Sequence, residues 1–315
     1  MIIRMPDNWQ CVEAEHNAYV NTLIDGFIDS QPAEAALLAT NLFLRSTRAL
    51  LVSGDKQDLD GAISAFIAFK KKLPARDKIL FLQDLKALFD YKKFSNRQPG
   101  WDAYKLCDGS KLRTCPYCNH AYAFTLRRVE KGLLRPTLDH FYSKSQYPHL
   151  ALTLINLIPS CNTCNSSLKS TKNFYKQIHL HPFFDEERIS FRCEADGKEI
   201  TEICGKFAKL KPQIKIVVKS PRNCKASKNS IKTFALDLRY NELSHEGIDF
   251  ITAQSRAREL LANIDLHERG GERGKALDLK VEMEEELLRF NRKRYNSYLL
   301  GKMYADLYDL FKAPT

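Results

Sequence analysis

The sequence of 315 residues lacks the long apolar runs that membrane proteins contain. No stretch reaches the roughly 18 consecutive apolar residues that a transmembrane helix needs, so we expect a protein without a membrane partner. The opening residues, MIIRMPDNWQ, lack a charged segment followed by an apolar one and therefore do not resemble a secretory signal peptide. We expect a cytoplasmic protein. Its hydrophobic fraction of 44% and charged fraction of 28% are those of an ordinary globular protein.

Acidic residues are absent from the segment 206–232, although it contains nine Lys or Arg, and the whole chain has a formal net charge of +11. A solvated surface usually mixes charges of both signs, so a stretch of one sign indicates a polyanionic partner, nucleic acid above all. A flexible basic loop would have the same composition, and the sequence leaves that alternative open. The residues expected to contact phosphates in this segment are Lys206, Lys209, Lys211 and Lys215.

The order of helical and strand-like patterns predicts an α+β fold that is mostly α. Apolar residues recur at helical spacing near both ends of the chain, whereas the middle is rich in Cys, His, Asn and Pro. We expect four regions: a helical N-terminal region (1–100), a compact module that carries the chemistry (101–185), a β-rich basic segment (186–225) and a helical C-terminal region (226–315).

Two of these regions contain more specific patterns. In the β-rich segment, Ala195-Asp196-Gly197 lies between two alternating stretches, which predicts the turn of a short β hairpin. In the C-terminal region, the amphipathic stretch 276–312 predicts one long helix.

The chain contains nine cysteines, and four of them form two Cys-x-x-Cys pairs. In a cytosolic protein such pairs indicate a metal more than disulfides. Four thiolates suit tetrahedral zinc, because each pair turns back far enough to offer both sulfurs to one ion. A redox pair of the thioredoxin type needs only one Cys-x-x-Cys beside a βαβ pattern, which is absent here. We predict a structural zinc ion bound by Cys115, Cys118, Cys161 and Cys164.

Four polar residues accompany these cysteines. Asp139, His140 and Asn156 lie between the two pairs, and Asn165 directly follows the last cysteine. The segment LLRPTLDHF predicts a strand that ends at Asp139-His140, NLIPSC a strand that begins at Asn156, and NSSLKSTKNF a helix that Asn165 opens. In such a strand–loop–strand–helix unit the four polar residues converge. Each alone has an ordinary interpretation, since an isolated Asn is usually a turn or cap residue.

Taken together, four motifs resemble the HNH endonucleases, which have the ββα-metal fold: CPYCN (115–119), LDHF (138–141), INLIPSC (155–161) and CNTCNSSLKS (161–170). The resemblance is to the branch of that family in which two Cys-x-x-Cys knuckles bracket the site, and it covers roughly residues 101–185. The last signature position of the family is His or Asn. Here it is Asn165, so the triad consists of His140, Asn156 and Asn165.

The resemblance implies hydrolysis of phosphodiester bonds in nucleic acid, with DNA favoured, to give 5′-phosphate ends. His140 would be the general base, since the pKa of histidine lies near working pH. Asp139 and Asn165 would hold one Mg²⁺ or Mn²⁺ ion through oxygen ligands, and Asn156 would tie the loop together and orient His140. The residues expected to grip flanking phosphates are Lys169 and Lys172.

A further resemblance concerns the residues outside the module. CPYCN, YPHLALTLINLIPSC, IHLHPFFD and LDLRYNELSHEG are similar to the HNH subunits of Septu-type and retron-associated anti-phage systems, which act with an ATPase partner. The sequence contains no G-x-x-x-x-G-K-[ST], so any ATPase would be a separate chain. Three alternatives stay open: a restriction or homing nuclease, a catalytically silent zinc-stabilised subunit that binds nucleic acid, and a subunit that assembles a complex or a homo-oligomer.

Overall fold

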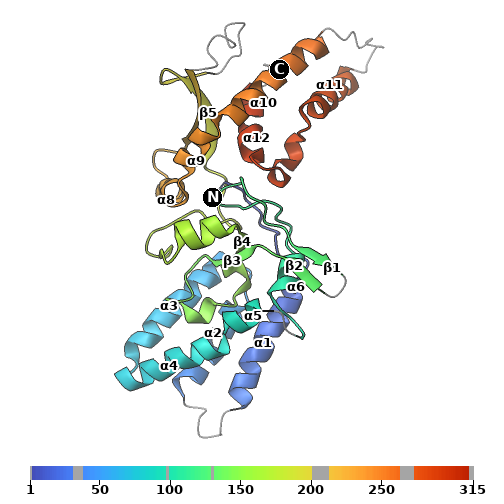
Figure 1. Cartoon of the computed structure of the whole chain (residues 1–315). Coiled ribbons are helices and arrows are strands. Elements are labelled where there is room, and N and C mark those ends of the chain that lie inside the picture. The colour runs from blue at the N-terminus through green and yellow to red at the C-terminus, as the bar shows by residue number, and fades with distance from the viewer. Residues whose placement is uncertain are drawn as a thin grey trace. The chain divides into compact units, whose positions relative to one another are not determined.

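The computed structural model describes residues 2–30, 38–96, 99–128, 131–200, 213–262 and 273–311 (Figure 1). It has a mixed α+β architecture in which helices predominate, so the expected fold class is confirmed. The chain divides into two compact units. The first unit consists of Arg4–Pro116 and Tyr122–Glu186, and the second of Met1–Ile3, Tyr117–Ala121 and Glu187–Thr315. None of the described helices combines the length and the apolar character that a membrane crossing needs.

The first unit begins with a group of helices, of which α2, α3 and α4 share an aromatic core. The ring of Phe43 in α2 lies 6.1 Å from that of Phe66 in α3 and 5.2 Å from that of Phe81 in α4. Asp55 and Asp90 begin α3 and α5, where their carboxylates accept backbone N–H groups that the helix leaves unpaired. The helices are α1 Glu13–Asp29, α2 Ala39–Leu51, α3 Lys56–Lys72, α4 Ala75–Leu88, α5 Tyr91–Ser95 and α6 Ala103–Asp108.

A strand–loop–strand–helix segment follows in the same unit. Strands β3 (Thr137–His140) and β4 (Leu157–Ser160) pair antiparallel, with His140 opposite Leu157. The loop between them contains two short 3₁₀ turns, η2 (Pro148–Leu150) and η3 (Leu154–Asn156), and β4 leads into the π-helix η4 (Thr163–Lys169). A separate hairpin of β1 (Leu126–Arg128) and β2 (Lys131–Leu134) precedes β3.

The predicted strand end at Asp139-His140 is confirmed, and the second strand begins at Leu157 rather than at Asn156. The prediction that Asn165 opens a helix through NSSLKSTKNF was wrong, because η4 begins two residues earlier and ends at Lys169. It ends there because Ser170 has a positive φ of 49°, a conformation that does not continue a right-handed helix.

The second unit contains a three-stranded antiparallel sheet of order β6-β5-β7 and a set of helices. The predicted hairpin turn is confirmed: Asp196 and Gly197 join β5 to β6, and both have positive φ, as a two-residue hairpin turn requires. The elements are β5 Ser190–Ala195, β6 Lys198–Glu199, β7 Ile214–Lys219, α8 Lys225–Phe234, α9 Leu236–Glu242, α10 Ser244–Ala262, α11 Arg273–Leu288, η6 Arg292–Ser297 and α12 Gly301–Leu310.

The prediction of one long helix over 276–312 was wrong, because three separate helices, α11, η6 and α12, occupy this stretch. The chain leaves the helical conformation at Arg289 (φ 50°) and at Leu300 (φ 57°). Between these points the side chain of Asn291 accepts the backbone N–H of Arg294 and thereby starts η6. Periodicity of apolar residues does not reveal such breaks, because the residues on either side still have helical spacing.

Five buried histidines of the first unit should make stability depend on pH. Burial lowers the pKa of His16 and His179 to about 4, and that of His140, His149 and His181 to about 3. An unfolded chain protonates its histidines near pH 6.5, whereas the folded chain keeps these neutral. The free energy of unfolding should therefore fall as pH decreases from about 6.5 towards 3, with no contribution from these groups above pH 7.

Urea unfolding at pH 7 and pH 5 measures this effect. His149 stacks on the ring of Phe66 at 4.3 Å and lies outside the cavity described below, so His149→Phe removes one titrating group and keeps an aromatic ring. The loss of stability between the two pH values should be smaller in this variant by on the order of 1–2 kcal/mol. Equal losses in the two proteins would contradict the assignment of His149 as a neutral buried histidine.

Candidate active site and its cysteine cluster

The first Cys-x-x-Cys pair, Cys115 and Cys118, lies in a tight turn. A bridge between Thr114 and Tyr122 closes the segment at its base. Asn119 directly follows the pair with a positive φ of 53°, a conformation that Asn tolerates better than most residues. The sequence CPYCN thus reverses the chain within a few residues, as a metal-binding knuckle must.

The second pair joins β4 to η4. Cys161 follows the strand, Cys164 lies in the helix, and the backbone N–H of Cys164 is 3.4 Å from the sulfur of Cys161. The Sγ atoms of Cys115, Cys118, Cys161 and Cys164 all lie within 4.8 Å of one another. Tetrahedral zinc with Zn–S bonds of about 2.3 Å separates its sulfurs by roughly 3.8 Å. The four cysteines can therefore hold a zinc ion with all four positions filled by protein, which indicates a structural role.

Asn156, the last residue of η3, is fully buried and ties the loop 141–156 together. Its Oδ1 accepts the backbone N–H of Tyr142 at 2.7 Å. Its Nδ2 donates to the carbonyl oxygens of Tyr142 at 3.1 Å and Leu150 at 3.0 Å. The amide of Asn156 thus holds Tyr142, at the start of the loop, close to Leu150. The role of Asn156 in orienting His140 stays a prediction.

His140 ends β3 with its imidazole directed at that loop. Nε2 lies 3.0 Å from the carbonyl oxygen of Ala151. Because a carbonyl oxygen only accepts, Nε2 must carry the proton. Burial, with the ammonium groups of Lys144 and Lys169 nearby, lowers the pKa of His140 to about 3, so the ring is neutral at pH 7. Nδ1 is then an unprotonated nitrogen that can accept a proton.

Two more aromatic side chains hold the same loop and β4. Nε2 of His16 in α1 donates to the carbonyl oxygen of Leu152 at 2.7 Å, while its Nδ1 accepts the indole N–H of Trp101 at 3.0 Å. The indole N–H of Trp9 donates to the carbonyl oxygen of Leu157 at 3.2 Å. No local pattern in the sequence predicts these contacts, because the partners lie more than 80 positions apart.

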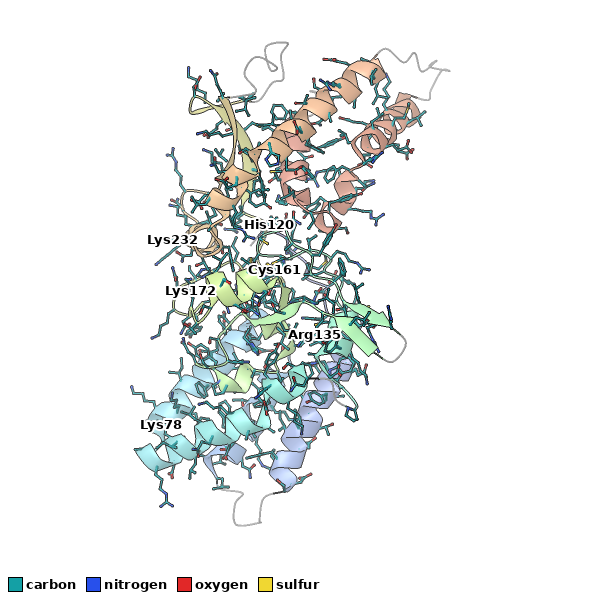
Figure 2. All side chains as sticks on the ribbon, in the orientation of Figure 1. Lys78, His120, Arg135, Cys161, Lys172 and Lys232 are labelled. Atoms are coloured by element: carbon teal, nitrogen blue, oxygen red, sulfur yellow. The ribbon has the colours of Figure 1, made fainter. Side chains whose placement is uncertain are left out.

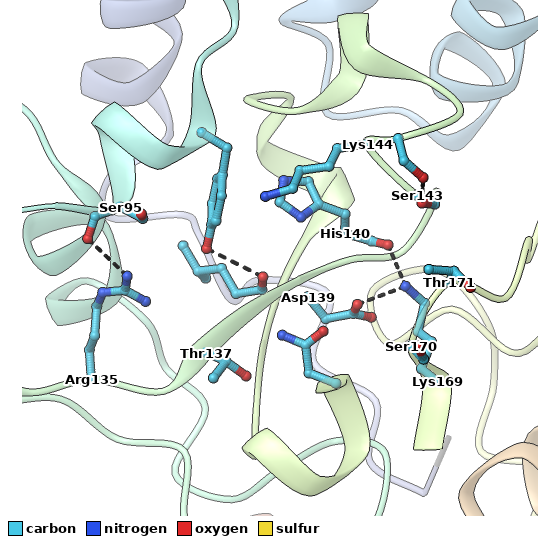
Figure 3. Close-up of a pocket in the computed structure, with 14 residues that line it drawn as sticks. Ser95, Arg135, Thr137, Asp139, His140, Ser143, Lys144, Lys169, Ser170 and Thr171 are labelled. Atoms are coloured by element: carbon cyan, nitrogen blue, oxygen red, sulfur yellow. Dashed lines mark hydrogen bonds and ion pairs between the residues drawn. The ribbon is translucent and has the colours of Figure 1, made fainter. Parts of the chain in front are cut away.

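Asp139 forms an ion pair with Lys169 that is buried on both sides. The Nζ atom of Lys169 lies 2.7 Å from Oδ1 of Asp139 and 2.5 Å from the backbone carbonyl oxygen of His140, and each side chain of the pair is only 2% exposed (Figure 3). The ring of Phe174 covers the ammonium, with 5.0 Å between Nζ and the ring centroid. The expected position of Lys169, open to flanking phosphates, is therefore not the position that it occupies.

A cavity of about 410 Å³ brings Asp139, His140 and Asn165 together. Three cations, Arg135, Lys144 and Lys169, also line the cavity, and Figure 3 shows them around Asp139 and His140. Three cations face one carboxylate, so the cavity suits an anion. Hydroxyl groups that suit phosphate oxygens complete much of the lining: Tyr91, Ser95, Thr137, Ser143, Ser145, Ser170 and Thr171.

Tyr91 also lines the cavity, although its segment showed only the helical spacing of apolar residues in the sequence. Its ring meets the imidazole of His140 edge-on at 4.4 Å. The ammonium of Lys144 lies 4.1 Å from the centroid of the same ring. Burial raises the pKa of Tyr91 to about 12, so its hydroxyl keeps its proton at neutral pH.

Two of the remaining lysines that were predicted to contact phosphates are exposed, and three lie outside the described residues. Lys172 is exposed on the surface of the first unit (Figure 2), and Lys215 is exposed on β7 of the second. Lys206, Lys209 and Lys211 lie outside the described residues. Their expected role in binding nucleic acid stays a prediction.

Comparison with known proteins gives one partial relative. A stretch of 110 residues is 37% identical to protein ea31 of Escherichia phage lambda, covering 34% of this chain and 33% of that protein. The match thus spans about a third of the length of this relative. No protein-family model matches the chain, and no solved structure matches it.

The cysteine cluster should make the purified protein contain about one zinc per chain. Cys164→Ser should abolish most of that zinc and lower the midpoint of thermal unfolding, because a structural zinc ion contributes directly to folding free energy. Plasma emission spectrometry measures the metal. Cys11→Ser, at an exposed cysteine outside the cluster, is the matched control and should retain the zinc. A zinc-free wild type whose stability a chelator leaves unchanged would contradict this assignment.

The buried ion pair should make stability depend on Lys169. Lys169→Met keeps an unbranched chain but leaves Asp139 buried without its ammonium, which should lower the free energy of unfolding by about 3–5 kcal/mol. Adding Asp139→Asn should restore most of the loss. Lys172→Met, at an exposed lysine of the same segment, should change it by less than about 0.5 kcal/mol. Chemical denaturation measures all four proteins, and a stable Lys169→Met protein would refute a buried charge pair.

Proposed function

We propose that the chain is a metal-dependent endonuclease of the HNH type that hydrolyses phosphodiester bonds in nucleic acid, with DNA as the favoured substrate. The observation that carries the proposal is the hydrogen bond from Nε2 of His140 to the carbonyl oxygen of Ala151. It assigns the proton to one ring nitrogen and leaves the other as a base, inside a cavity lined with cations. The HNH-like motifs and their strand–loop–strand–helix setting support the same activity.

His140 acts as the general base by accepting a proton from water at Nδ1. Its low pKa makes it a weak base without a bound phosphate, because burial and two nearby ammonium groups disfavour the charged ring. A bound phosphate brings negative charge beside the imidazole and raises that pKa towards the range in which general bases work. The hydrogen bond to Ala151 then stabilises the imidazolium, since Nε2–H remains its donor.

Asp139 and Asn165 offer the oxygen ligands that Mg²⁺ or Mn²⁺ prefers, and both line the cavity beside His140. When bound, a divalent ion neutralises the charge that grows on the phosphate and the leaving oxygen. Lys169 shares the Asp139 carboxylate, so this ion pair must admit the metal ion or yield to it. Arg135 and Lys144 supply positive charge for the phosphate from other sides of the lining.

One observation favours a second candidate, a zinc-stabilised subunit that binds nucleic acid without cleaving it. The ammonium of Lys169 already neutralises the carboxylate that the metal ion would need. A silent module of this kind would keep the cavity as a phosphate-binding site. The action of the nuclease in anti-phage defence with an ATPase partner, or instead in restriction or homing, is a proposal that rests on the sequence resemblance alone.

Plasmid nicking tests the nuclease. Purified wild-type protein with Mg²⁺ or Mn²⁺ should convert supercoiled plasmid to open circles, and EDTA should stop the reaction. His140→Ala should slow nicking by at least about 100-fold, the usual contribution of a general base. His245→Ala is the matched control, because His245 is an exposed histidine outside the cavity.

Two results would count against the proposal. Equal nicking by the wild type and His140→Ala would show that the activity has another source. Absence of nicking by a wild type that retains zinc and binds DNA would favour the silent module.

A further inference from the structure

A second cavity, of about 630 Å³, lies in the first unit between α3, α4 and the segments that contain Tyr147 and Asn173. Lysines dominate its lining. Lys70 and Lys71 come from the end of α3, Lys78 and Lys86 from α4, and Lys176 from the chain after η4. Figure 2 labels Lys78 on this helical part of the unit. We call these five residues the lysine groove.

The positive charge of the lysine groove is not neutralised from within. Its lining contains no Asp or Glu. None of the five lysines forms an ion pair with a residue in the described part of the chain, although Lys56, on the same helix as Lys70, does so with Asp185. Uncompensated charges of one sign gathered in a concave surface raise the local concentration of an oppositely charged partner.

The lysine groove adjoins the cavity that contains His140. Ser145 lines both cavities, and its hydroxyl is 2.9 Å from that of Ser143, which lines the candidate active site. A polyanion in the groove can therefore continue into the cavity that contains Arg135, Lys144 and Lys169 without leaving a positive surface. This continuity favours an extended chain of phosphates over a compact acidic protein.

We propose that the lysine groove binds the phosphodiester backbone of the nucleic acid and leads it to His140. The inference rests on the proposed function, because it names the path of that substrate. Binding is independent of base sequence: Phe66 and Tyr147, the aromatic residues of the lining, are only 2% and 5% exposed and offer no open face for base stacking. Lysines that contact phosphates carry affinity rather than sequence information.

The salt dependence of binding tests the lysine groove. The variant Lys70→Gln/Lys78→Gln/Lys86→Gln is compared with Lys72→Gln/Lys93→Gln/Lys111→Gln, which removes three exposed lysines of the same unit that line neither cavity. Fluorescence anisotropy follows binding of a labelled 20-base-pair DNA duplex, and of the RNA duplex of the same sequence, in EDTA between 50 and 200 mM NaCl. Zinc content and thermal unfolding of each variant verify the fold.

Each phosphate contact contributes about 0.9 to the slope of log K against log salt on duplex DNA. The groove variant should therefore lose about 2–3 units of slope and bind at least tenfold more weakly at 100 mM NaCl, whereas the control should lose less than about one unit. The duplex, DNA or RNA, on which the groove variant loses more slope identifies the substrate.

Equal slopes of log K against log salt in the two variants would refute binding of the phosphate backbone by the lysine groove, even if the wild type nicks plasmid. Absence of binding of either duplex by the wild type would also overturn it and would favour an acidic protein partner. A loss of slope confined to the groove variant, in a protein whose wild type never nicks, would support the groove and refute the proposed catalysis. Failure of the two proposals is thus distinguishable.

Discussion

The buried amide of Asn156 is the constraint on which the rest of the candidate site depends. A fully buried side-chain amide is costly unless its donors and acceptor are paired, and the amide of Asn156 pairs with backbone groups of one loop. The amide fixes the loop at Tyr142 and Leu150, and Ala151 comes next. The carbonyl oxygen of Ala151 then decides which nitrogen of His140 carries the proton. The backbone arrangement of this loop thus determines which nitrogen of His140, the candidate base, is protonated.

The cysteine cluster and the ion pair complete this arrangement in different ways. Zinc at the four sulfurs would fix the start of η4, the helix that carries Asn165 and Lys169. The side chain of Lys169 forms an ion pair with Asp139 on β3, which lies 30 positions earlier in the chain. The contact that keeps the Asp139 carboxylate paired also competes for the oxygen atoms that a divalent ion would use. The proposed function therefore requires Lys169 both to stabilise Asp139 and to release it.

The sequence predicted the parts of the structure that depend on local chemistry. The strand end at Asp139-His140, the hairpin turn at Asp196-Gly197 and the gathering of two Cys-x-x-Cys pairs follow from short motifs with strong conformational preferences. The burial of Lys169 does not follow from its segment, NSSLKSTKNF, which is mostly polar and suits an exposed helix. Its partner is distant in sequence, so the ion pair appears only in the folded chain.

Other features depend on distant residues in the same way. The helix breaks at Arg289 and Leu300 leave apolar periodicity intact, so the sequence predicted one helix where there are three. The lysine groove combines the end of α3 with one face of α4, and each helix alone has the lysines of an ordinary solvated surface. Tyr91 likewise belongs to a helical segment whose pattern is that of the core.

The protonation state of His140 is the most direct test of this account. Long-range proton–nitrogen correlation spectra of nitrogen-15 histidine-labelled protein report it, with the signal assigned by its loss in His140→Gln. We predict a neutral ring at pH 7 and at pH 5, protonated at Nε2 and unprotonated at Nδ1. A ring protonated at Nδ1 alone, or charged already at pH 6, would contradict this prediction, because Nδ1 would then be unavailable as the base.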